Sequence, residues 1–454
     1  MKNGWNSRLF GSTLPTGQST AVPWAFCSWL LVASLVVNIG TAALTRQHET
    51  TQSLDSDERE YWAIATDFQN SGFDAVPARR TPPFPMLVAG LRSLVGNDYF
   101  HVQLALSTLV AVSPILVFLL VRRRFGNLPA AKLASVGFLL WPAFVRYNAS
   151  LYSDSIGMLV FLCYLLAFPL PAAPGAAEWR RWLQFGIAGA VLSFAVQMKP
   201  LYLVYVPFAL ALTVWGETSL RRRSVAALCL VVGCVAAAAP WSAYLSAREG
   251  RFIPVSANDG ETLAGGLNPA LLSMDKKDTV FVTAGGRITW VGPGKWLPIE
   301  DTGYLSPAEL KLPYVAKSAL LNQRAHEWII SHPLQTAYLC ARKLLYMWGL
   351  YPFWNGAAQS LLGNFPLLVL MSTGLVALWM GRQALPELAL FWSLPLFVSL
   401  VSVISWGSWR FRMPGDLGLI VLTALLPALW ANRRRLNRAG DSSEGVITAA
   451  TVPA

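Results

Sequence analysis

Residues 24–44 read WAFCSWLLVASLVVNIGTAAL, and residues 55–65 read DSDEREYWAIA. The first stretch carries no charge and is long enough to cross a membrane as one helix, which needs about 20 mostly apolar residues. The second opens with Asp55, Asp57 and Glu58 in a chain whose formal net charge is +12. This order predicts a membrane span followed by an acidic segment at the membrane surface.

The composition extends this prediction to the whole chain. Of its 454 residues, 54% are hydrophobic and only 13% are charged, whereas soluble domains carry about 25% charged residues. Repeated apolar runs therefore predict an all-α polytopic membrane protein with about ten spans. The predicted spans are 24–44, 102–121, 129–147, 155–170, 183–198, 201–215, 224–241, 361–380, 388–406 and 414–431.

Basic clusters predict the orientation of these spans. They fall in alternate loops, at Arg122–Arg124, Arg180–Arg181, Arg221–Arg223, Arg382 and Arg433–Arg435. Cytoplasmic loops are enriched in Lys and Arg, so both termini are predicted to be cytoplasmic. The first span is long and lacks the flanks of a cleaved signal, which favours an uncleaved anchor. We expect a cell membrane protein with its functional groups on the extracytoplasmic face.

Four regions follow from this topology. Residues 1–241 form the N-terminal membrane module, in which 45–100 is the first outside loop. Residues 242–360 form a long outside loop of mixed character, 361–432 the last membrane helices, and 433–454 a cytoplasmic tail. Within the long loop, 277–300 alternates around a Gly-Gly turn and predicts a small hairpin. Residues 334–350 predict a helix at the membrane interface, because Arg342 and Lys343 are unfavourable at a bilayer centre.

The first outside loop predicts two short amphipathic helices. In 57–70, Tyr61, Ile64, Ala65 and Phe68 form one apolar face at helical spacing. Ser56 can cap this helix, and acidic residues in its first turn are favoured by the helix dipole. The prolines of 79-RRTPPFPMLVAGLRSLVG-96 set the start of a second helix that ends at Gly96. Capping alone would account for the acidic cluster.

The motifs, taken in order, resemble the GT-C superfamily of membrane glycosyltransferases. The pattern DE-x-x-Y-x-x-x-A at 57–65 is followed by R-T-P-x-x-P from Arg80. Further similar stretches are 151-LYSDSIGMLVFL-162, 198-MKPLYLVYVP-207, 250-GRFIPVSANDGETLAGGLNP-269 and 409-WRFRMP-414. Within the superfamily, the chain resembles the bacterial branch of the protein O-mannosyltransferases and the lipid A aminoarabinose transferase. The resemblance covers nearly the whole chain.

The resemblance implies a hexosyl- or pentosyltransferase that moves a sugar from a polyprenyl-phosphate donor to an acceptor hydroxyl at the outer face, with inversion. Such a transfer needs a carboxylate as general base for the acceptor. The developing oxocarbenium ion also favours a nearby negative charge. The phosphate leaving group needs cations, for which the planar fork of Arg is well suited. The acidic motifs predicted to lie outside supply the carboxylates, and the basic motifs predicted to lie outside supply the cations.

The resemblance then assigns candidate roles. Asp57 matches the base and Glu58 its neighbour in the motif, while Asp55 is an alternative register. Candidate substrate-binding residues are Asp154, Tyr152, Lys199, Arg80, Arg410 and Arg412. Asp154 can instead cap its span, and the basic residues can instead extend toward lipid headgroups. Outside placement runs against the positive-inside bias, which favours a role for Arg410, Arg412 and Lys199 and leaves both interpretations open for Arg80.

Cofactor and partners are less specified. The resemblance leaves open a divalent metal near Asp57, Glu58 or His326, but none of the four His has the spacing of a metal site. The predicted partners are a polyprenyl-linked sugar, the bilayer and an unidentified protein or glycolipid acceptor, with no nucleic acid.

Two other functional classes compete with the glycosyltransferase. One is a polyprenyl-linked glycan ligase or polymerase of another membrane fold. The other is a secondary transporter, which would place ionisable residues near the bilayer midplane.

Overall fold

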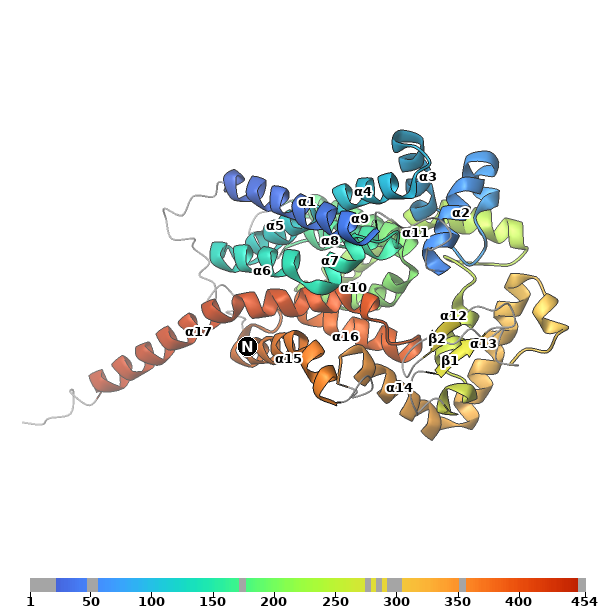
Figure 1. The fold of residues 1–454 in the computed structure, drawn as a ribbon. Helices are drawn as coiled ribbons and strands as arrows, with labels where there is room; N and C mark the ends of the chain where they lie inside the picture. The colour runs from blue at the N-terminus through green and yellow to red at the C-terminus, as the bar shows by residue number, and fades with distance from the viewer. Residues whose placement is uncertain are drawn as a thin grey trace, which may run out of the picture.

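The computed structural model shows a predominantly helical chain (Figure 1). It describes residues 22–46, 56–170, 177–273, 279–282, 288–291, 304–350 and 357–447. Long helices lie side by side along one direction, while shorter helices and one hairpin gather at the right-hand end in Figure 1. The predicted class, a helical membrane fold, is therefore confirmed.

Each predicted span overlaps an apolar helical stretch. In chain order these are α1 (Trp24–Arg46), α4 (Tyr99–Val110) with α5 (Ser113–Phe125), α6 (Leu128–Leu140) with α7 (Pro142–Asn148), α8 (Ser153–Ala167), α9 (Glu178–Met198), η2 (Pro200–Tyr205) with α10 (Val206–Gly216), α11 (Leu220–Glu249), α15 (Ala357–Met380), α16 (Ala389–Ile404) and α17 (Met413–Ile447). The helix α17 runs beyond the predicted span into the predicted tail.

The number of spans stays a prediction. Within the described residues, four stretches are long and apolar enough to cross a membrane: Trp24–Thr45, Tyr99–Phe125, Leu220–Glu249 and Trp409–Arg434. The pair α6 and α7 is bent by 55° and counts as a fifth if it is one broken span. The remaining apolar helices are shorter, so length and composition alone do not establish ten crossings.

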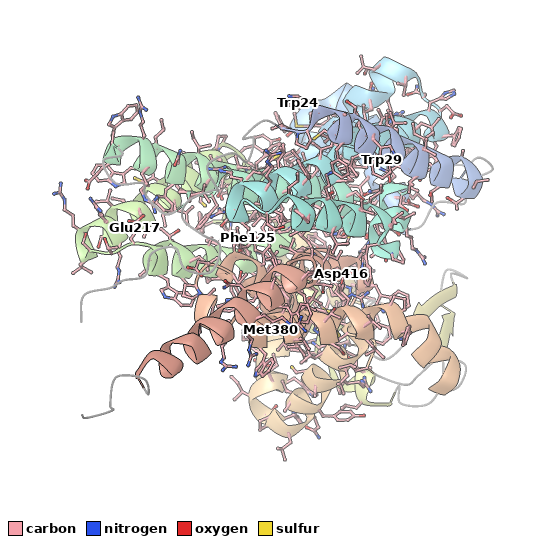
Figure 2. The ribbon with its side chains drawn as sticks, turned by 90° about the vertical axis from the view of Figure 1, so that its left-hand side faces the viewer. Trp24, Trp29, Phe125, Glu217, Met380 and Asp416 are labelled. Atoms are coloured by element: carbon pink, nitrogen blue, oxygen red, sulfur yellow. The ribbon has the colours of Figure 1, made fainter. Side chains whose placement is uncertain are left out.

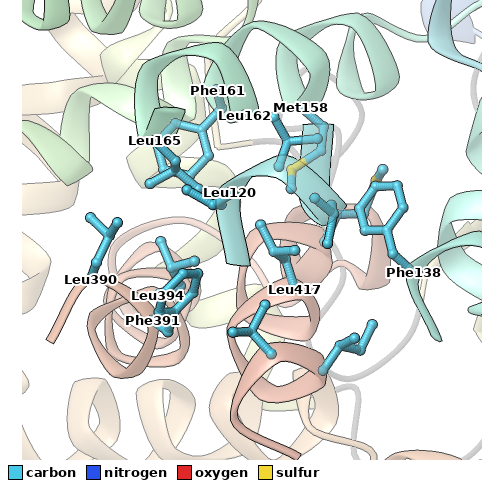
Figure 3. Close-up of a cluster of buried hydrophobic side chains, with 14 of the residues drawn as sticks. Leu120, Phe138, Met158, Phe161, Leu162, Leu165, Leu390, Phe391, Leu394 and Leu417 are labelled. Atoms are coloured by element: carbon cyan, nitrogen blue, oxygen red, sulfur yellow. The ribbon is translucent and has the colours of Figure 1, made fainter. Parts of the chain in front are cut away.

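The hydrophobic core lies where the N-terminal and C-terminal helices meet (Figure 3). Leu120 of α5 and Phe161 of α8 are fully buried, as are Phe391 of α16 and Leu417 of α17. Figure 3 shows these side chains pointing toward one another across the helices. The last two helices therefore pack against the first module, which brings the start of α17 close to the first outside loop.

The first outside loop folds as predicted into two short helices. They are α2 (Ser56–Ser71) and α3 (Pro83–Val95), separated by the 3-10 turn η1 (Gly72–Ala75). Gly72 and Gly96 have φ values of 60° and 92°, a backbone region that favours glycine, and each follows directly on a helix. The apolar faces of α2 and α3 pack together, with the rings of Tyr61 and Phe84 4.8 Å apart.

The Arg clusters lie at the other end of the bundle from α2 and α3. Figure 2 looks at this end and labels Phe125 and Glu217, which adjoin two of the clusters. Arg124, at the end of α5, donates a hydrogen bond to the carbonyl of Phe168 after α8. Arg181 of α9 pairs with Glu217, and Arg222 of α11 pairs with Glu178. We call this the basic end. Its assignment to the cytoplasm stays a prediction.

The long outside loop is mixed, as predicted. It contains the helices α12 (Asp259–Gly266), α13 (Tyr314–Ser331) and α14 (Pro333–Met347) and the 3-10 turns η3 (Pro269–Ser273) and η5 (Glu309–Lys311). The strands β1 (Thr279–Val282) and β2 (Ile288–Val291) pair antiparallel, which confirms the hairpin. The predicted interfacial helix is α14, but its Arg342 and Lys343 are buried in the protein, where backbone carbonyls accept their hydrogen bonds.

Two further 3-10 turns connect the C-terminal helices. The turn η6 (Arg382–Ala384) precedes α16, and η7 (Trp409–Arg412) joins α16 to α17. Because η7 carries the basic motif of the sequence and lies at the start of α17, it brings that motif to the end of the bundle where α2 lies.

Candidate active site

Asp57 lies at the centre of an ion-pair network between distant parts of the chain. One carboxylate oxygen is 2.7 Å from Nη2 of Arg80, in the segment before α3. The other is 2.7 Å from Nη2 of Arg410, on η7. The Asp57 side chain keeps 22% of its surface exposed, so it remains reachable from outside the bundle. The structure thus unites the acidic and basic motifs of the sequence.

The surrounding cations determine the charge state of Asp57. Burial alone would raise the pKa of its carboxyl group, but Arg410, Arg80 and Lys199 oppose this and hold the pKa well below its ordinary value. A carboxylate held in this way stays ionised and is a weak proton acceptor.

A second ion pair lies beside the first. Nζ of Lys199, in the turn between α9 and η2, is 2.9 Å from Oδ2 of Asp154 at the start of α8. Asp154 is almost fully buried, and its Oδ1 has no hydrogen-bond partner among the described residues. The Nε of Arg80 is likewise buried without a partner in this part of the chain. Buried polar atoms normally have partners, so both atoms are available to a ligand.

Aromatic rings support the cations of the site. The guanidinium of Arg410 lies 4.9 Å from the ring centre of Tyr152 and 5.3 Å from that of Phe411. Nζ of Lys199 lies 5.1 Å from the same Phe411 ring. A ring face attracts a cation without neutralising its charge. Both side chains are therefore held in place while they keep their charge for another partner.

The charge balance of these linked ion pairs favours an anion. Glu60 pairs with Arg80 at 2.5 Å and with Arg79 at 2.7 Å. With it, the group contains three carboxylates, since Asp57 and Asp154 belong to it, and four cations, since Arg410 and Lys199 belong to it as well. Cations that lie this close together repel one another, and a bound phosphate would relieve the repulsion.

Glu58, the predicted partner of Asp57, faces a different direction. It is fully buried, and its Oε1 accepts hydrogen bonds from the backbone N–H of Leu151 at 2.8 Å and from the hydroxyl of Tyr99 at 3.3 Å. These contacts tie α2 to α4 and to the segment that carries Tyr152 and Asp154. Glu58 therefore helps to position α2 against the segment that carries Tyr152 and Asp154.

Arg412 is also turned away from Asp57. Its Nε is 2.9 Å from Asp416, and its Nη1 donates to the carbonyl of Met347 at 2.7 Å. Asp416 is fully buried and also accepts from Nε1 of Trp141 at 2.8 Å. These bonds fix η7 between α14, α17 and the segment before α7. Of the eight candidate residues, four lie around the Asp57 and Asp154 carboxylates: Arg80, Arg410, Lys199 and Tyr152. Glu58 and Arg412 instead contact Leu151 and Asp416.

Several residues of the site were missed from the sequence. The hydroxyl of Tyr61 lies 3.2 Å from that of Ser153 and 3.3 Å from Nη1 of Arg80. The sequence placed Tyr61 only on the apolar face of its helix. The hydroxyl of a buried tyrosine usually has a hydrogen-bond partner, which is the signal that could have indicated its place in the site. Tyr314 of α13 hydrogen-bonds Glu261 at 2.6 Å, and Arg79 lies 5.8 Å from its ring centre. The long loop thus contributes to the rim of the site.

The described residues contain no group of three His, Cys, Asp or Glu that could hold a metal ion. Both oxygens of Asp57 face guanidiniums, and Glu58 faces a backbone N–H. His326 is on α13, where its ring contacts the carbonyl of Asn322. Asp55 lies outside the described residues. These residues do not fit a metal centre, and we assign no step to a metal.

A family profile matches part of the chain. Residues 79–244 match the sequence profile of the dolichyl-phosphate-mannose-protein mannosyltransferases. No curated protein sequence matches the chain. The match begins at Arg79 and includes Arg80, Asp154 and Lys199 of the site. It confirms the predicted resemblance and, with it, the enzyme class of glycosyltransferase.

Solved structures also align with most of the chain, and two of them are as follows. ArnT from Cupriavidus metallidurans bound to undecaprenyl phosphate is 16% identical, with a TM-score of 0.40 over 90% of this chain and 78% of that one. The archaeal oligosaccharyltransferase AglB from Archaeoglobus fulgidus, in complex with an inhibitory peptide and a dolichol-phosphate, is 14% identical, with a TM-score of 0.49 over 92% of this chain and 52% of that one. Likeness at this level does not transfer side-chain roles between proteins.

Proposed function

We propose that this chain transfers a sugar from a polyprenyl-phosphate donor to an acceptor hydroxyl, with inversion, at the outer face of the cell membrane. The observation that carries the proposal is the Asp57 carboxylate between the guanidiniums of Arg80 and Arg410, beside the pair of Lys199 and Asp154. The match to a family of mannosyltransferases that use dolichyl-phosphate-mannose supports the donor class.

In the proposed reaction, the acceptor oxygen attacks the anomeric carbon while the bond from that carbon to the phosphate oxygen breaks. The acceptor proton goes to Asp57, and polyprenyl phosphate leaves with the bonding electrons. Arg410 and Lys199 bind the departing phosphate, because charge-assisted bonds from such donors are the strong ones. Oδ1 of Asp154, which has no partner among the described residues, can accept a hydrogen bond from a hydroxyl of the sugar or of the acceptor.

The resting ion pairs imply an order of events. While Arg410 contacts Asp57, the carboxylate is a poor base. A phosphate that takes over Arg410 removes one of the charges that depress the pKa of Asp57. The base then becomes more effective only when the donor is in place.

The test is sugar transfer by purified protein in lipid, with a panel of undecaprenyl-phosphate-linked sugars and a membrane extract as acceptor. We expect Asp57→Asn to lower the rate about 10²- to 10⁴-fold, the range of general-base contributions. The control is Asp67→Asn, which removes an exposed carboxylate from the same helix. Equal rates for wild type and Asp57→Asn would refute the assignment of the base.

The donor class is tested separately by binding. Undecaprenyl phosphate should bind to wild type and to Asp57→Asn, since neither variant lacks the cations. It should bind more weakly to Arg410→Gln, which lacks one donor to phosphate. If undecaprenyl phosphate binds to none of these proteins while the chain is folded, the polyprenyl-phosphate donor is excluded.

A further inference from the structure

A groove lies between α15 and α17, near the basic end and away from the candidate active site. Its volume is about 740 Å³. Its apolar walls are formed by Val376, Trp379 and Met380 of α15 and by Leu426, Pro427 and Trp430 of α17. About twenty residues of α17 separate this region from η7, which corresponds to roughly 30 Å of helix. Met380 marks its place in Figure 2.

Three guanidiniums surround the aromatic walls of this groove. Arg433 lies 4.4 Å from the ring centre of Trp379, and Arg382 lies 5.6 Å from the same ring. Arg434 lies 3.5 Å from the ring centre of Trp430. Arg433 and Arg434 themselves line the groove. Trp379 and Trp430 are each about half exposed, so the groove is open to its surroundings.

These arginines differ from others at the same end. Arg181 pairs with Glu217, and Arg222 pairs with Glu178. Throughout the described part of the chain, no carboxylate pairs with Arg382, Arg433 or Arg434. Contacts with ring faces leave the positive charge in place. The groove therefore combines an apolar channel with a group of cations to which no described carboxylate is paired.

We propose that this groove binds one anionic phospholipid of the surrounding membrane. An acyl chain would lie along the walls from α15 and α17, and Arg433, Arg434 and Arg382 would bind the headgroup phosphate. Basic pockets between membrane helices are suited to such headgroups. An arginine guanidinium can donate two parallel hydrogen bonds to two oxygens of one phosphate. The indole rings hold the guanidiniums in position.

The three arginines at the groove are not explained by extension of single arginine side chains toward lipid headgroups. Arg180 is an example of such a single side chain at the same end of the bundle, because it lies 5.5 Å from the ring of the exposed Trp179. Neither residue lines the groove. At α15 and α17, by contrast, three arginines contact two rings at the edge of one channel. Arg180 thus provides a matched control.

The experiment uses the full chain, extracted in mild detergent with equimolar phosphatidylglycerol and phosphatidylcholine and examined by native mass spectrometry. Wild type should retain one phosphatidylglycerol. The double variant Arg433→Gln with Arg434→Gln should weaken retention roughly 25-fold, a factor of about five for each basic residue near an anionic lipid. Arg180→Gln should retain the lipid as wild type does.

A second variant tests the channel. Val376→Trp fills the groove from α15 and leaves all three arginines in place, so it should also lose the lipid. Retention by Val376→Trp, or equal loss by Arg180→Gln, would overturn the proposal in favour of unspecific attraction to charge. Displacement of phosphatidylglycerol by a lower concentration of undecaprenyl phosphate would instead identify the occupant as the polyprenyl carrier. Melting temperatures in phosphatidylcholine alone establish that each variant is folded.

Discussion

Nη2 of Arg410 lies 2.7 Å from Oδ2 of Asp57, which joins the turn before the last helix to the start of the first surface helix. Two residues further on, Arg412 contacts Asp416 instead. The two arginines of one short motif therefore have different partners. One faces the group that we assign as base, and the other holds the turn in place.

This difference predicts that substitution of Arg410 lowers the activity, whereas substitution of Arg412 lowers the stability of the fold. Arg410→Gln removes a charge-assisted bond to phosphate of about 1.5–3 kcal/mol and should lower kcat/KM for the donor roughly 10- to 150-fold. Arg412→Gln leaves Asp416 buried without its cation, which should destabilise the fold by about 3–5 kcal/mol. Donor kinetics and melting temperature, measured on both variants, separate the effects.

The control for Arg412 is the double variant with Asp416→Asn, in which neither partner is charged. It should recover part of the stability lost in Arg412→Gln, because the unpaired buried charge is gone. A rise in KM for Arg412→Gln at unchanged stability would show instead that Arg412 binds the donor directly.

The pKa of Asp57 predicts how stability depends on pH. In the folded chain it lies below the value of about 3.9 typical of an unfolded chain. The ionised carboxylate therefore stabilises the fold above about pH 4, and this contribution is lost as the pH falls below that value. The difference in melting temperature between wild type and Asp57→Asn should be constant from about pH 5 to 8 and shrink below about pH 4.

The matched control is Asp67→Asn, since Asp67 is exposed on the same helix and forms no ion pair in the described structure. Its melting temperature should follow that of wild type across the whole range. A difference between wild type and Asp57→Asn that grows on acidification would contradict the sign of the argument.

The order of the elements could be predicted from the sequence because its physical signals are local. Apolar runs predicted the positions of the membrane helices. The spacing of Tyr61, Ile64 and Phe68 together with the prolines before Phe84 predicted α2 and α3. The candidate residues could be chosen because their motifs resemble those of a known glycosyltransferase family.

The direction of each side chain could not be predicted in this way. Asp57 and Glu58 are adjacent on an α-helix and point about 100° apart, so one reaches the ion pairs and the other is buried against Leu151. Arg410 and Arg412 are two residues apart on a 3-10 turn and point about 120° apart. Which of each pair faces the site depends on how η7 and α2 pack against distant elements.

Glu58 permits a direct test of its role. If it only accepts hydrogen bonds from Leu151 and Tyr99, then Glu58→Gln keeps an acceptor oxygen and should retain activity within about tenfold of wild type. Glu58→Ala leaves these donors unsatisfied and should cost about 1–3 kcal/mol of stability. A loss of activity in Glu58→Gln as large as that in Asp57→Asn, at unchanged stability, would make Glu58 part of the chemistry.

The last prediction concerns the helix pair that holds Lys199. Helix α9, which ends just before Lys199, crosses α11 at Gly189, where an added Cβ would lie 2.1 Å from the carbonyl oxygen of Leu230. A backbone carbonyl in a helix cannot yield locally, so Gly189→Ala should push the helices apart and destabilise the fold by about 1–3 kcal/mol. One turn earlier, an added Cβ at Gly186 would lie 3.8 Å from its nearest neighbour, which is ordinary contact. Gly186→Ala should therefore melt as wild type does, and equal melting temperatures for the two variants would show that this helix crossing is looser than the structure indicates.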